Sequence, residues 1–320
     1  MILCVGTTPA AQRVMVFDRL IAGEVNRARI TLDGFAGKSV NVAKVLCQLG
    51  LRVAAVGFAG GERGTELVEI LQDLGADTDF VRLGIATRQC VTVIDRTTGT
   101  TTELVEESAP VPDDCYEKLR GMVVRRLPHC RALVLSGTIT PGGPVQFYRE
   151  CVELANKAGC LAIVDAKGAP LKEALKASPG LVKPNRAELA ATVGTELPDE
   201  IAVMDAMRRL HKRGARRVVV TDGNGPVLAF DGQQFWRIRP PKIEAVNPIG
   251  SGDAFTAGLV WRLVEGDDLG EACRWGAAAG SANALSLMPG ELNSSETTSL
   301  AAETTAEPIQ VEPRLLPGVP

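Results

Sequence analysis

Short apolar runs alternate along the chain with amphipathic segments, and this order limits the folds that are open to it. The apolar runs lie at residues 2–6, 53–57, 132–137, 161–166 and 217–223. Between the first runs, apolar residues recur at helical spacing, in one segment at Val42, Val45, Leu46 and Leu49 and in another at Leu67, Ile70, Leu71 and Leu74. We expect strands buried on both faces, which predicts an open, mostly parallel α/β sheet flanked by helices on both faces. Ligands of such sheets bind beyond the carboxyl ends of the strands.

Two stretches, residues 12–33 and 87–106, alternate apolar and polar residues at a period of two, and a Thr98-Gly99 turn divides the second. This pattern predicts a small, half-exposed antiparallel sheet, inserted in the α/β domain as a lid. An Asp-Gly turn at Asp231 and Gly232 predicts a hairpin over residues 225–238. We therefore expect an α/β domain over residues 1–290, followed by a tail over 291–320 that is rich in Ser, Thr, Glu and Pro.

The composition favours a small-molecule partner. The chain has 320 residues, 45% of them hydrophobic, and a net charge of −3, so it lacks the basic footprint of a nucleic-acid binder. No apolar run reaches the roughly 18 residues of a membrane span, and no signal peptide precedes the first strand. Eight scattered cysteines without a C-x-x-C pair indicate reduced, buried thiols, and two histidines make a histidine-based metal site improbable. We expect a cytoplasmic protein.

The segment "AVNPIGSGDAFTAGL", residues 245–259, places glycines and an acid at the start of a helical pattern. The first backbone N–H groups of a helix have no intrahelical partner, so Gly250, Ser251 and Gly252 could seat anionic oxygens beside Asp253. The alternative is structural, because Asp253 could cap the helix after a tight glycine turn.

The segment "DGFAGKSVNVAKVLCQLG", residues 33–50, brings a second glycine-rich loop to a helix entrance. Gly34, Gly37, Lys38 and Asn41 would offer backbone groups, one cation and one amide to a polyhydroxylated ligand. Ordinary loop chemistry before a helix explains the same residues.

The segment "LVKPNRAEL", residues 181–189, ends an apolar run with Lys183, Pro184 and Asn185 and continues with Glu188 one helical turn later. The amide and the carboxylate lie on one helix face, where they could orient the waters of a Mg²⁺ ion. A proline-initiated helix with a cap and a glutamate at its third position is the alternative interpretation.

Together these segments resemble the PfkB/ribokinase family of carbohydrate kinases, from residue 1 to about 290. "GFAGKSVNVAKVLCQLG" is similar to the family's N-terminal signature, and "NPIGSGDAFTAG" to its C-terminal signature. Within the family, several segments resemble the branch of 1-phosphofructokinases and tagatose-6-phosphate kinases. They are "VNR" (25–27), "TR" (87–88), "SGTITPG" (136–142), "KPNRAEL" and "WGAAAGSANAL" (275–285). The resemblance implies a ribokinase-like fold and ATP-dependent phosphorylation of a hexose phosphate, of the fructose 1-phosphate or tagatose 6-phosphate type.

The resemblance also implies roles for individual residues. Asp253 would be the general base, and Gly250, Ser251 and Gly252 would stabilise the transferring phosphoryl group. Mg²⁺ would be oriented through water by Asn185 and Glu188. The remaining residues would bind the sugar phosphate (Gln12, Arg27, Gly37, Lys38, Asn41 and Arg88) or ATP (Lys183, Asn185, Thr221, Gly223, Gly225 and Asn283).

The chain departs from the branch at the first loop, where "TTPAAQRV" (7–14) carries Thr8 and Gln12 at the usual Asn and Asp positions. A neutral amide can still donate and accept hydrogen bonds, but it is not a two-acceptor carboxylate. A kinase of an unphosphorylated sugar or nucleoside is therefore an alternative, as is a non-catalytic sugar sensor. We also expect a homodimer through the lid, because apolar lid positions such as Val14, Val16, Val91 and Val93 need cover.

Overall fold

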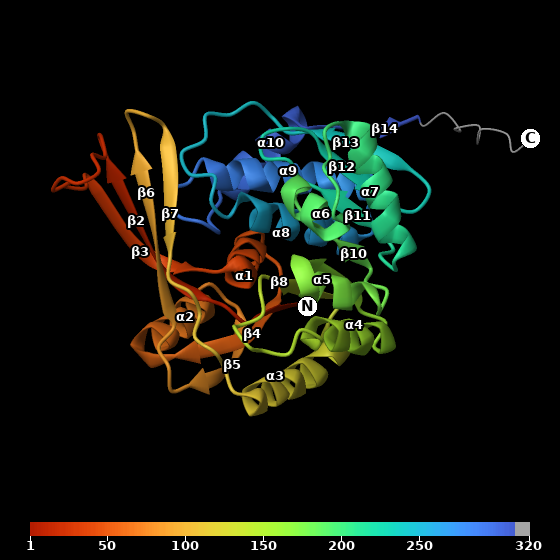
Figure 1. The fold of residues 1–320 in the computed structure, drawn as a ribbon, viewed down its shortest axis with the longest axis horizontal. Coiled ribbons are helices and arrows are strands. Elements are labelled where there is room, and N and C mark those ends of the chain that lie inside the picture. The colour runs from red at the N-terminus through yellow and green to blue at the C-terminus, as the bar shows by residue number, and fades with distance from the viewer. Residues whose placement is uncertain (311–320) are drawn as a thin grey trace, which may run out of the picture.

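A computed structural model describes residues 1–310 of the chain. Its main element is a ten-stranded sheet, shown in Figure 1. In spatial order the strands are β14 (Thr305–Ile309), β13 (Phe235–Arg239), β12 (Val227–Phe230), β11 (Val218–Val220), β10 (Leu181–Val182), β9 (Leu161–Asp165), β8 (Ala132–Ser136), β1 (Ile2–Gly6), β4 (Val53–Gly60) and β5 (Asp77–Leu83). The strands from β11 to β5 run parallel to one another, so the mostly parallel sheet expected from the sequence is confirmed.

Two helical layers cover the sheet, and the central strand β1 shows why both are needed. Leu3 and Val5 point into one apolar core, while Ile2 and Cys4 point into the other. A strand without polar positions can be buried only when both of its faces are covered. The layer over Leu3 and Val5 consists of α3 (Asp113–Arg126), α4 (Phe147–Lys157), α5 (Gly168–Leu175), α6 (Arg186–Val193) and α7 (Glu200–Lys212). The layer over Ile2 and Cys4 consists of α1 (Lys38–Gln48), α2 (Gly61–Asp73), α8 (Ser251–Glu265) and α9 (Leu269–Ala284).

The two helices expected from apolar spacing form α1 and α2, but α2 buries a different stripe. Leu67, Val68 and Leu71 are its buried apolar residues, whereas Ile70 and Leu74 are exposed. A short 3₁₀ helix, Leu127–His129, follows α3. The hairpin expected over residues 225–238 is also present as β12 and β13, with Gly232 at φ 101° in its turn.

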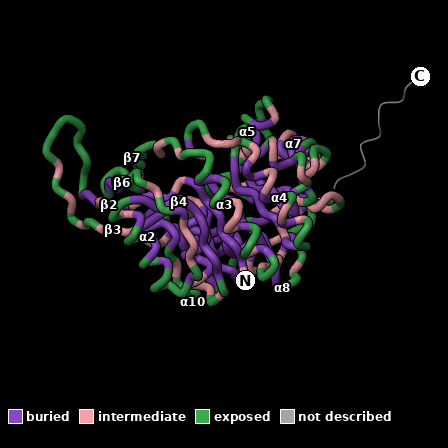
Figure 2. The backbone as a smooth tube through the Cα atoms, turned by 90° about the horizontal axis from the view of Figure 1, so that it is seen from below, coloured by how far each residue is buried: buried purple, intermediate pink, exposed green. Residues whose placement is uncertain are grey.

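The lid is a second sheet that projects from the α/β body (Figures 1 and 2). Its strands, in spatial order, are β3 (Ile30–Ala36), β2 (Ala10–Phe17), β6 (Arg88–Asp95) and β7 (Thr100–Val105). The outer pairs are antiparallel, as predicted, but the central pair β2 and β6 is parallel. The reason lies in the main sheet, because β2 and β6 both leave the carboxyl ends of parallel strands, β1 and β5.

The C-terminal segment adds structure beyond residue 290. Helix α10 (Ser294–Glu303) packs against α9, and β14 pairs with β13 as the last strand of the main sheet. Residues 291–309, which the sequence places in a tail, therefore extend the sheet and its helical cover. The remainder of that tail, residues 311–320, lies outside the described residues.

The cysteines and the longest helices agree with the composition of the chain. All eight cysteines are free thiols, as the lack of paired spacing predicts. Within residues 1–310, no helix is both long enough and apolar enough to pass through a lipid bilayer.

Candidate active site

The expected phosphate loop lies at the carboxyl side of the sheet, where Gly250 precedes helix α8. Gly250 has φ 85°, a left-handed conformation that favours glycine. A Cβ atom on Gly250 would lie 2.8 Å from the Cβ of Pro289, so both the backbone and the available space require glycine. The close approach between this loop and the loop at Pro289 therefore explains the glycine at position 250 in "PIGSG".

Some backbone N–H groups of this loop donate hydrogen bonds within the loop, and others have no acceptor. The Ser251 N–H donates to the carbonyl of Pro248, and the Asp253 N–H donates to that of Gly250. Within residues 1–310, the N–H groups of Gly250 and Gly252 have no acceptor. Free donors at a helix N-terminus can bind phosphoryl oxygens.

Asp253 is a buried carboxylate beside this loop, with 6% of its surface exposed. Burial raises its pKa from 3.8 to about 7, and the charge of Asp165 acts in the same direction. Lys38, a hydrogen bond from Asn41 and Lys183 each lower that pKa without cancelling the effect of burial. A carboxylate with a pKa near 7 is suited to accept a proton at neutral pH.

Asn41, on α1, links the two glycine-rich segments predicted from the sequence. Its Nδ2 donates to Oδ2 of Asp253 at 2.7 Å, across 212 residues of sequence. Its Oδ1 is buried and has no hydrogen-bond partner within the described residues. An unpaired buried carbonyl beside a buried carboxylate is a place for a hydroxyl donor.

Asp165 is a site residue that the sequence reasoning missed. It ends β9, is 1% exposed, and accepts from Lys183 Nζ at 2.9 Å, Lys38 Nζ at 3.1 Å and Thr256 Oγ1 at 3.1 Å. Burial alone would raise its pKa, but Lys183 and Lys38 outweigh burial and lower it to about 2. An acid at the carboxyl end of a buried strand, in "LAIVDA", was the signal that could have identified it.

Asn185 and Glu188 form the helix cap that was the alternative interpretation of their segment. Asn185 Oδ1 accepts from the Glu188 N–H at 2.8 Å, and Glu188 Oε2 accepts from the Asn185 N–H at 3.0 Å. The second carboxylate oxygen, Oε1 of Glu188, lies 3.7 Å from Lys38 Nζ. No group of three His, Cys, Asp or Glu side chains that could hold a metal ion occurs within residues 1–310. Carboxylate and amide oxygens such as those of Glu188 and Asn185 are of the type that Mg²⁺ and its waters prefer.

The residues expected at the nucleotide lie at the same edge of the sheet. Thr221 forms a parallel bridge with Asn185, and the turn that follows contains Gly223 at φ 57° and a Gly225 N–H bond to Asp222. Asn283 differs from these residues, because its side-chain amide is fully buried and hydrogen-bonded to the backbone of this chain. It donates to the carbonyl of Ile249 at 3.0 Å and accepts from the Gly290 N–H at 2.7 Å.

A buried lysine, Lys44, fixes the loop that closes over this region. Its Nζ donates to the carbonyl of Phe35 at 3.2 Å and to that of Pro289 at 2.9 Å. Burial lowers its pKa, and Glu291 partly opposes that shift. Lys44 therefore connects the end of lid strand β3 with the loop beside Gly250.

The predicted sugar-binding residues of the lid lie at different places along it. Gln12 is 2% exposed and donates to Thr92 Oγ1 at 2.9 Å. Arg88 lies at the base of the lid, where it donates to the carbonyls of Glu106 and Thr8, and its buried Nε has no acceptor within the described residues. Arg27 is exposed in the loop between β2 and β3.

The two arginines lie at opposite ends of the lid. Arg88 pairs in register with Ala10, at the first residue of β2, while Arg27 lies beyond the pairing of Val16 with Ile30. Six strand residues at about 3.3 Å each separate these positions by about 20 Å.

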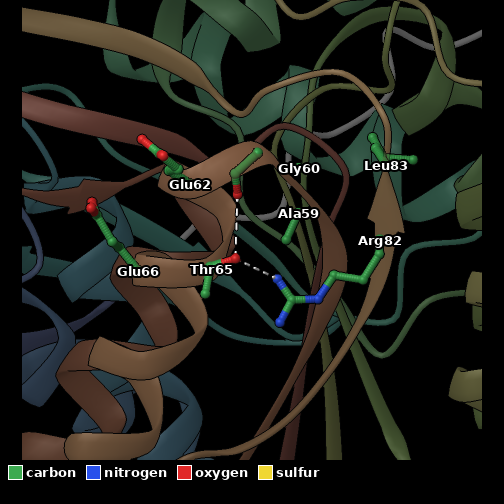
Figure 3. Close-up of a pocket in the computed structure, with 8 residues that line it drawn as sticks. Ala59, Gly60, Glu62, Thr65, Glu66, Arg82 and Leu83 are labelled. Carbon is green, nitrogen blue, oxygen red and sulfur yellow. Dashed lines mark hydrogen bonds between the residues drawn. The ribbon is translucent and has the colours of Figure 1, made fainter.

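A separate groove of about 630 Å³ lies between α2 and the edge strand β5 (Figure 3). Arg82 Nη1 donates to Thr65 Oγ1 at 3.3 Å there, and the side chains of Glu62 and Glu66 lie along the neighbouring helix. The residues that line this groove include none of the predicted site residues.

Comparison with known proteins agrees with this geometry. The model of the pfkB family carbohydrate kinases matches residues 1–295. Structures of phosphofructokinase-2 from Escherichia coli, among them a complex with fructose-6-phosphate and a tetrameric inhibited form, are similar with a TM-score of 0.84 and 28% identity. These alignments cover 94% of this chain and 98% of the other.

Two structures of lower sequence identity share the fold. A possible 1-phosphofructokinase from Thermotoga maritima has a TM-score of 0.89 at 24% identity, with 97% of this chain and 99% of the other covered. A ribokinase from Arabidopsis thaliana complexed with ribose and ATP has a TM-score of 0.75 at 21% identity, with 94% and 98% covered. The ribokinase-like fold is therefore confirmed, and the chain belongs to the pfkB family of carbohydrate kinases.

Proposed function

We propose that this kinase transfers the γ-phosphoryl group of ATP to a hydroxyl of a hexose phosphate, with Asp253 as the general base. The observation that carries the proposal is the buried pair of Asp253 and Asn41 beside two free backbone N–H groups, at Gly250 and Gly252. Together they provide a proton acceptor, a hydroxyl acceptor and anion donors around one point.

The chemistry follows from these groups. The attacking sugar hydroxyl gives its proton to Asp253 as its oxygen bonds to the γ-phosphorus, and the bond from that phosphorus to the β-phosphate oxygen breaks to release ADP. The unpaired Oδ1 of Asn41 accepts from a neighbouring hydroxyl and so orients the sugar. The N–H groups of Gly250 and Gly252 bind the charge that spreads over the phosphoryl oxygens.

Mg²⁺ bound with ATP would neutralise phosphate charge, and Glu188 and Asn185 would hold its waters. Lys183, whose ammonium lies close to Gly252, would face the ATP phosphates. Thr221, Gly223 and Gly225 would border the nucleoside.

The phosphate of the substrate would lie at the base of the lid, against Arg88. An arginine that approaches the site with a buried, unpaired Nε has a donor left for an anionic oxygen. The similar phosphofructokinase-2 of E. coli, crystallised with fructose-6-phosphate, supports a hexose phosphate. Fructose 1-phosphate, tagatose 6-phosphate and fructose 6-phosphate are the compounds to compare.

The test is kcat/KM for these three compounds and their unphosphorylated sugars, in the wild type and in Arg88→Ala. We expect the phosphorylated substrate to lose about 10- to 100-fold, since a charge-assisted hydrogen bond is worth roughly 1.5–3 kcal/mol. The unphosphorylated sugar should change little. Arg82→Ala is the matched control, because it makes the same chemical change in the separate groove of Figure 3.

The second candidate is a kinase of an unphosphorylated sugar or a nucleoside, which the neutral Gln12 amide in the lid favours. It predicts a wild-type preference for the unphosphorylated compounds and equal, small effects of Arg88→Ala on both classes. Absence of phosphotransfer to every compound, with ATP still bound, would indicate a sugar sensor.

We also propose a homodimer through the lid, formed by the face that carries Val91 and Val93 and not by the face that carries Val14 and Val16. Val14 and Val16 are buried against Met288 of the same chain and need no further cover. On the other face, Val91 pairs with Leu104, a residue that is 56% exposed. A second lid would cover this face, and a monomer in sedimentation at micromolar concentration would contradict the dimer.

We also propose a cytoplasmic location. The eight free thiols, six of them buried, are typical of a reducing compartment.

A further inference from the structure

The side chains predicted to bind the sugar differ in the polar groups that the protein leaves free. Lys38 follows Gly37, which has φ 110°, and its Nζ lies 3.1 Å from Oδ1 of Asp165 and 3.7 Å from Oε1 of Glu188. The Lys38 ammonium is therefore engaged by two acids. The two amides of the predicted group are arranged differently, because each of them keeps one atom without a partner.

Gln12, in lid strand β2, spends its amide nitrogen on the protein. Its Nε2 donates to Thr92 Oγ1 at 2.9 Å and to the carbonyl of Arg13 at 3.4 Å, so both of its hydrogens are used. A backbone carbonyl can only accept, which fixes the nitrogen on this side of the amide. Within residues 1–310, Oε1 of Gln12 has no hydrogen-bond partner.

The face of the lid that carries Gln12 is turned toward the body of the protein. Gln12, Val14 and Val16 alternate along β2 and share one face, and the two valines pack against Met288. A Cβ atom on Gly34, the partner of Gln12 on β3, would lie 2.5 Å from Cε of Met288. The loop that begins at Met288 therefore lies against the lid beside Gln12.

Asn41 borders the same loop and shows the same arrangement of its amide. A Cβ atom on Gly290 would lie 2.9 Å from Cα of Asn41. Asn41 donates its Nδ2 to Asp253, and its Oδ1 is buried and unpaired within the described residues. Around one loop, two amides thus give their nitrogens to the protein and keep their oxygens. Such oxygens recognise a group that donates a hydrogen, such as a sugar hydroxyl.

We propose that Thr92 is a positioning residue that fixes the Gln12 amide, so that the lid presents one neutral acceptor to the sugar and selects a hydroxyl there. The proposal rests on the proposed phosphorylation of a sugar and adds the residue that sets what the lid recognises. An amide whose nitrogen is free can turn about its last bond and present either its N–H groups or its oxygen. Thr92 is 0% exposed and holds the Gln12 nitrogen inside the lid, which leaves only the oxygen for the sugar.

The first test needs no substrate and follows the side-chain N–H groups of Gln12 by nuclear magnetic resonance after labelling with ¹⁵N-glutamine. Gln12→Glu identifies the signals, because it removes this NH₂ group. In Thr92→Val, which keeps the shape of the side chain but removes the acceptor, these hydrogens should exchange with water about fivefold faster than in the wild type. Thr92→Ser keeps the hydroxyl and should behave as the wild type. Thr102→Val is the matched control, because it makes the same change at an exposed lid position.

The second test measures sugar binding by calorimetry. The ligand is whichever of the sugars and sugar phosphates named above binds most tightly, and it is compared with its monodeoxy analogues. Thr92→Val should bind the complete ligand about five- to tenfold more weakly than the wild type. One analogue, which lacks the hydroxyl that Gln12 accepts, should bind equally to Thr92→Val and to the wild type. A merely structural role of Thr92 would weaken the binding of every analogue alike.

Two results would overturn the proposal. One is unchanged exchange of the Gln12 hydrogens in folded Thr92→Val, and the other is an equal loss of affinity for the ligand and all of its deoxy analogues. Failure of the proposed function has a different signature. If only an unphosphorylated sugar binds, the hexose phosphate assignment is wrong, and the analogues of that sugar still decide the role of Thr92.

Discussion

Replacing the predicted base, Asp253→Asn, should abolish phosphotransfer and at the same time stabilise the fold. Burial raises the pKa of Asp253 from 3.8 to about 7, which means that the folded protein binds this proton more tightly than the unfolded chain does. Such a group destabilises the fold once it must ionise. The cost is absent below pH 3.8, grows as the pH rises toward 7, and is constant above that.

The magnitude can be worked from the two pKa values. At pH 8 the raised pKa costs about 4 kcal/mol, and at pH 5 about 2 kcal/mol, by proton linkage. Asparagine carries no charge and can keep a hydrogen bond with Asn41 through its own carbonyl. Asp253→Asn should therefore unfold at higher urea than the wild type, with a gain that is about 2 kcal/mol larger at pH 8 than at pH 5.

The assay is urea unfolding of the wild type and the variant at pH 5 and pH 8, together with kcat for phosphotransfer. Asp73→Asn, at the exposed end of α2, is the matched control and should change neither stability nor rate. Loss of a positioned base should lower kcat by about 10²–10⁴. A stability gain that is equal at both pH values, or a variant with near-normal kcat, would refute the role and the burial of this acid.

Three further substitutions test the packing around the site. Asn41→Ala removes a hydrogen bond that lowers the pKa of Asp253, so the acid limb of the kcat/KM profile should move to higher pH; an unchanged profile would separate Asn41 from the base. Gly250→Ala places a Cβ 2.8 Å from Pro289 in a left-handed conformation, and it should cost about 1–2 kcal/mol in urea unfolding and lower kcat, whereas a neutral effect would contradict the loop geometry. Asn283→Ala leaves the Ile249 carbonyl and the Gly290 N–H unpaired in the interior, so it should lower stability by about 2–4 kcal/mol; a rise in KM for ATP at unchanged stability would instead favour the nucleotide contact predicted from the sequence.

Features that depend on local pattern were predictable from the sequence. The buried strands follow from apolar runs such as residues 2–6, and the hairpin at Gly232 follows from its turn residues. The strand β14, "TAEPI", was missed because an edge strand that exposes most of its residues carries no apolar run. The parallel pair of β2 and β6 was missed because strand direction is set by the main sheet and not by the lid's own residues.

Features that depend on distant residues were not predictable. Lys38 and Asp165 are 127 residues apart, and no local pattern indicates that they form an ion pair. The separation of Arg27 from Arg88 follows from the register of β2 with β3 and β6, which one sequence does not contain. The spacing of Asn185 and Glu188 is compatible with a helix cap and with contacts to the waters of Mg²⁺. In the structure the two residues form a capping box, and one carboxylate oxygen of Glu188 lies toward Lys38.

The two buried acids of the site differ in their surroundings, which only the three-dimensional structure shows. Asp165 and Asp253 are both nearly inaccessible to solvent. Asp165 ends β9, and Asp253 lies in the first turn of α8, at the carboxyl side of the sheet. Asp165 has two ammonium groups within 3.1 Å, so its pKa falls to about 2 and it cannot take up a proton at neutral pH. Asp253 has a neutral amide as its hydrogen-bond partner, so burial dominates and its pKa rises to about 7. Of these two acids, Asp253 therefore has the pKa suited to the proposed general base, and Asp165 pairs with the two lysines.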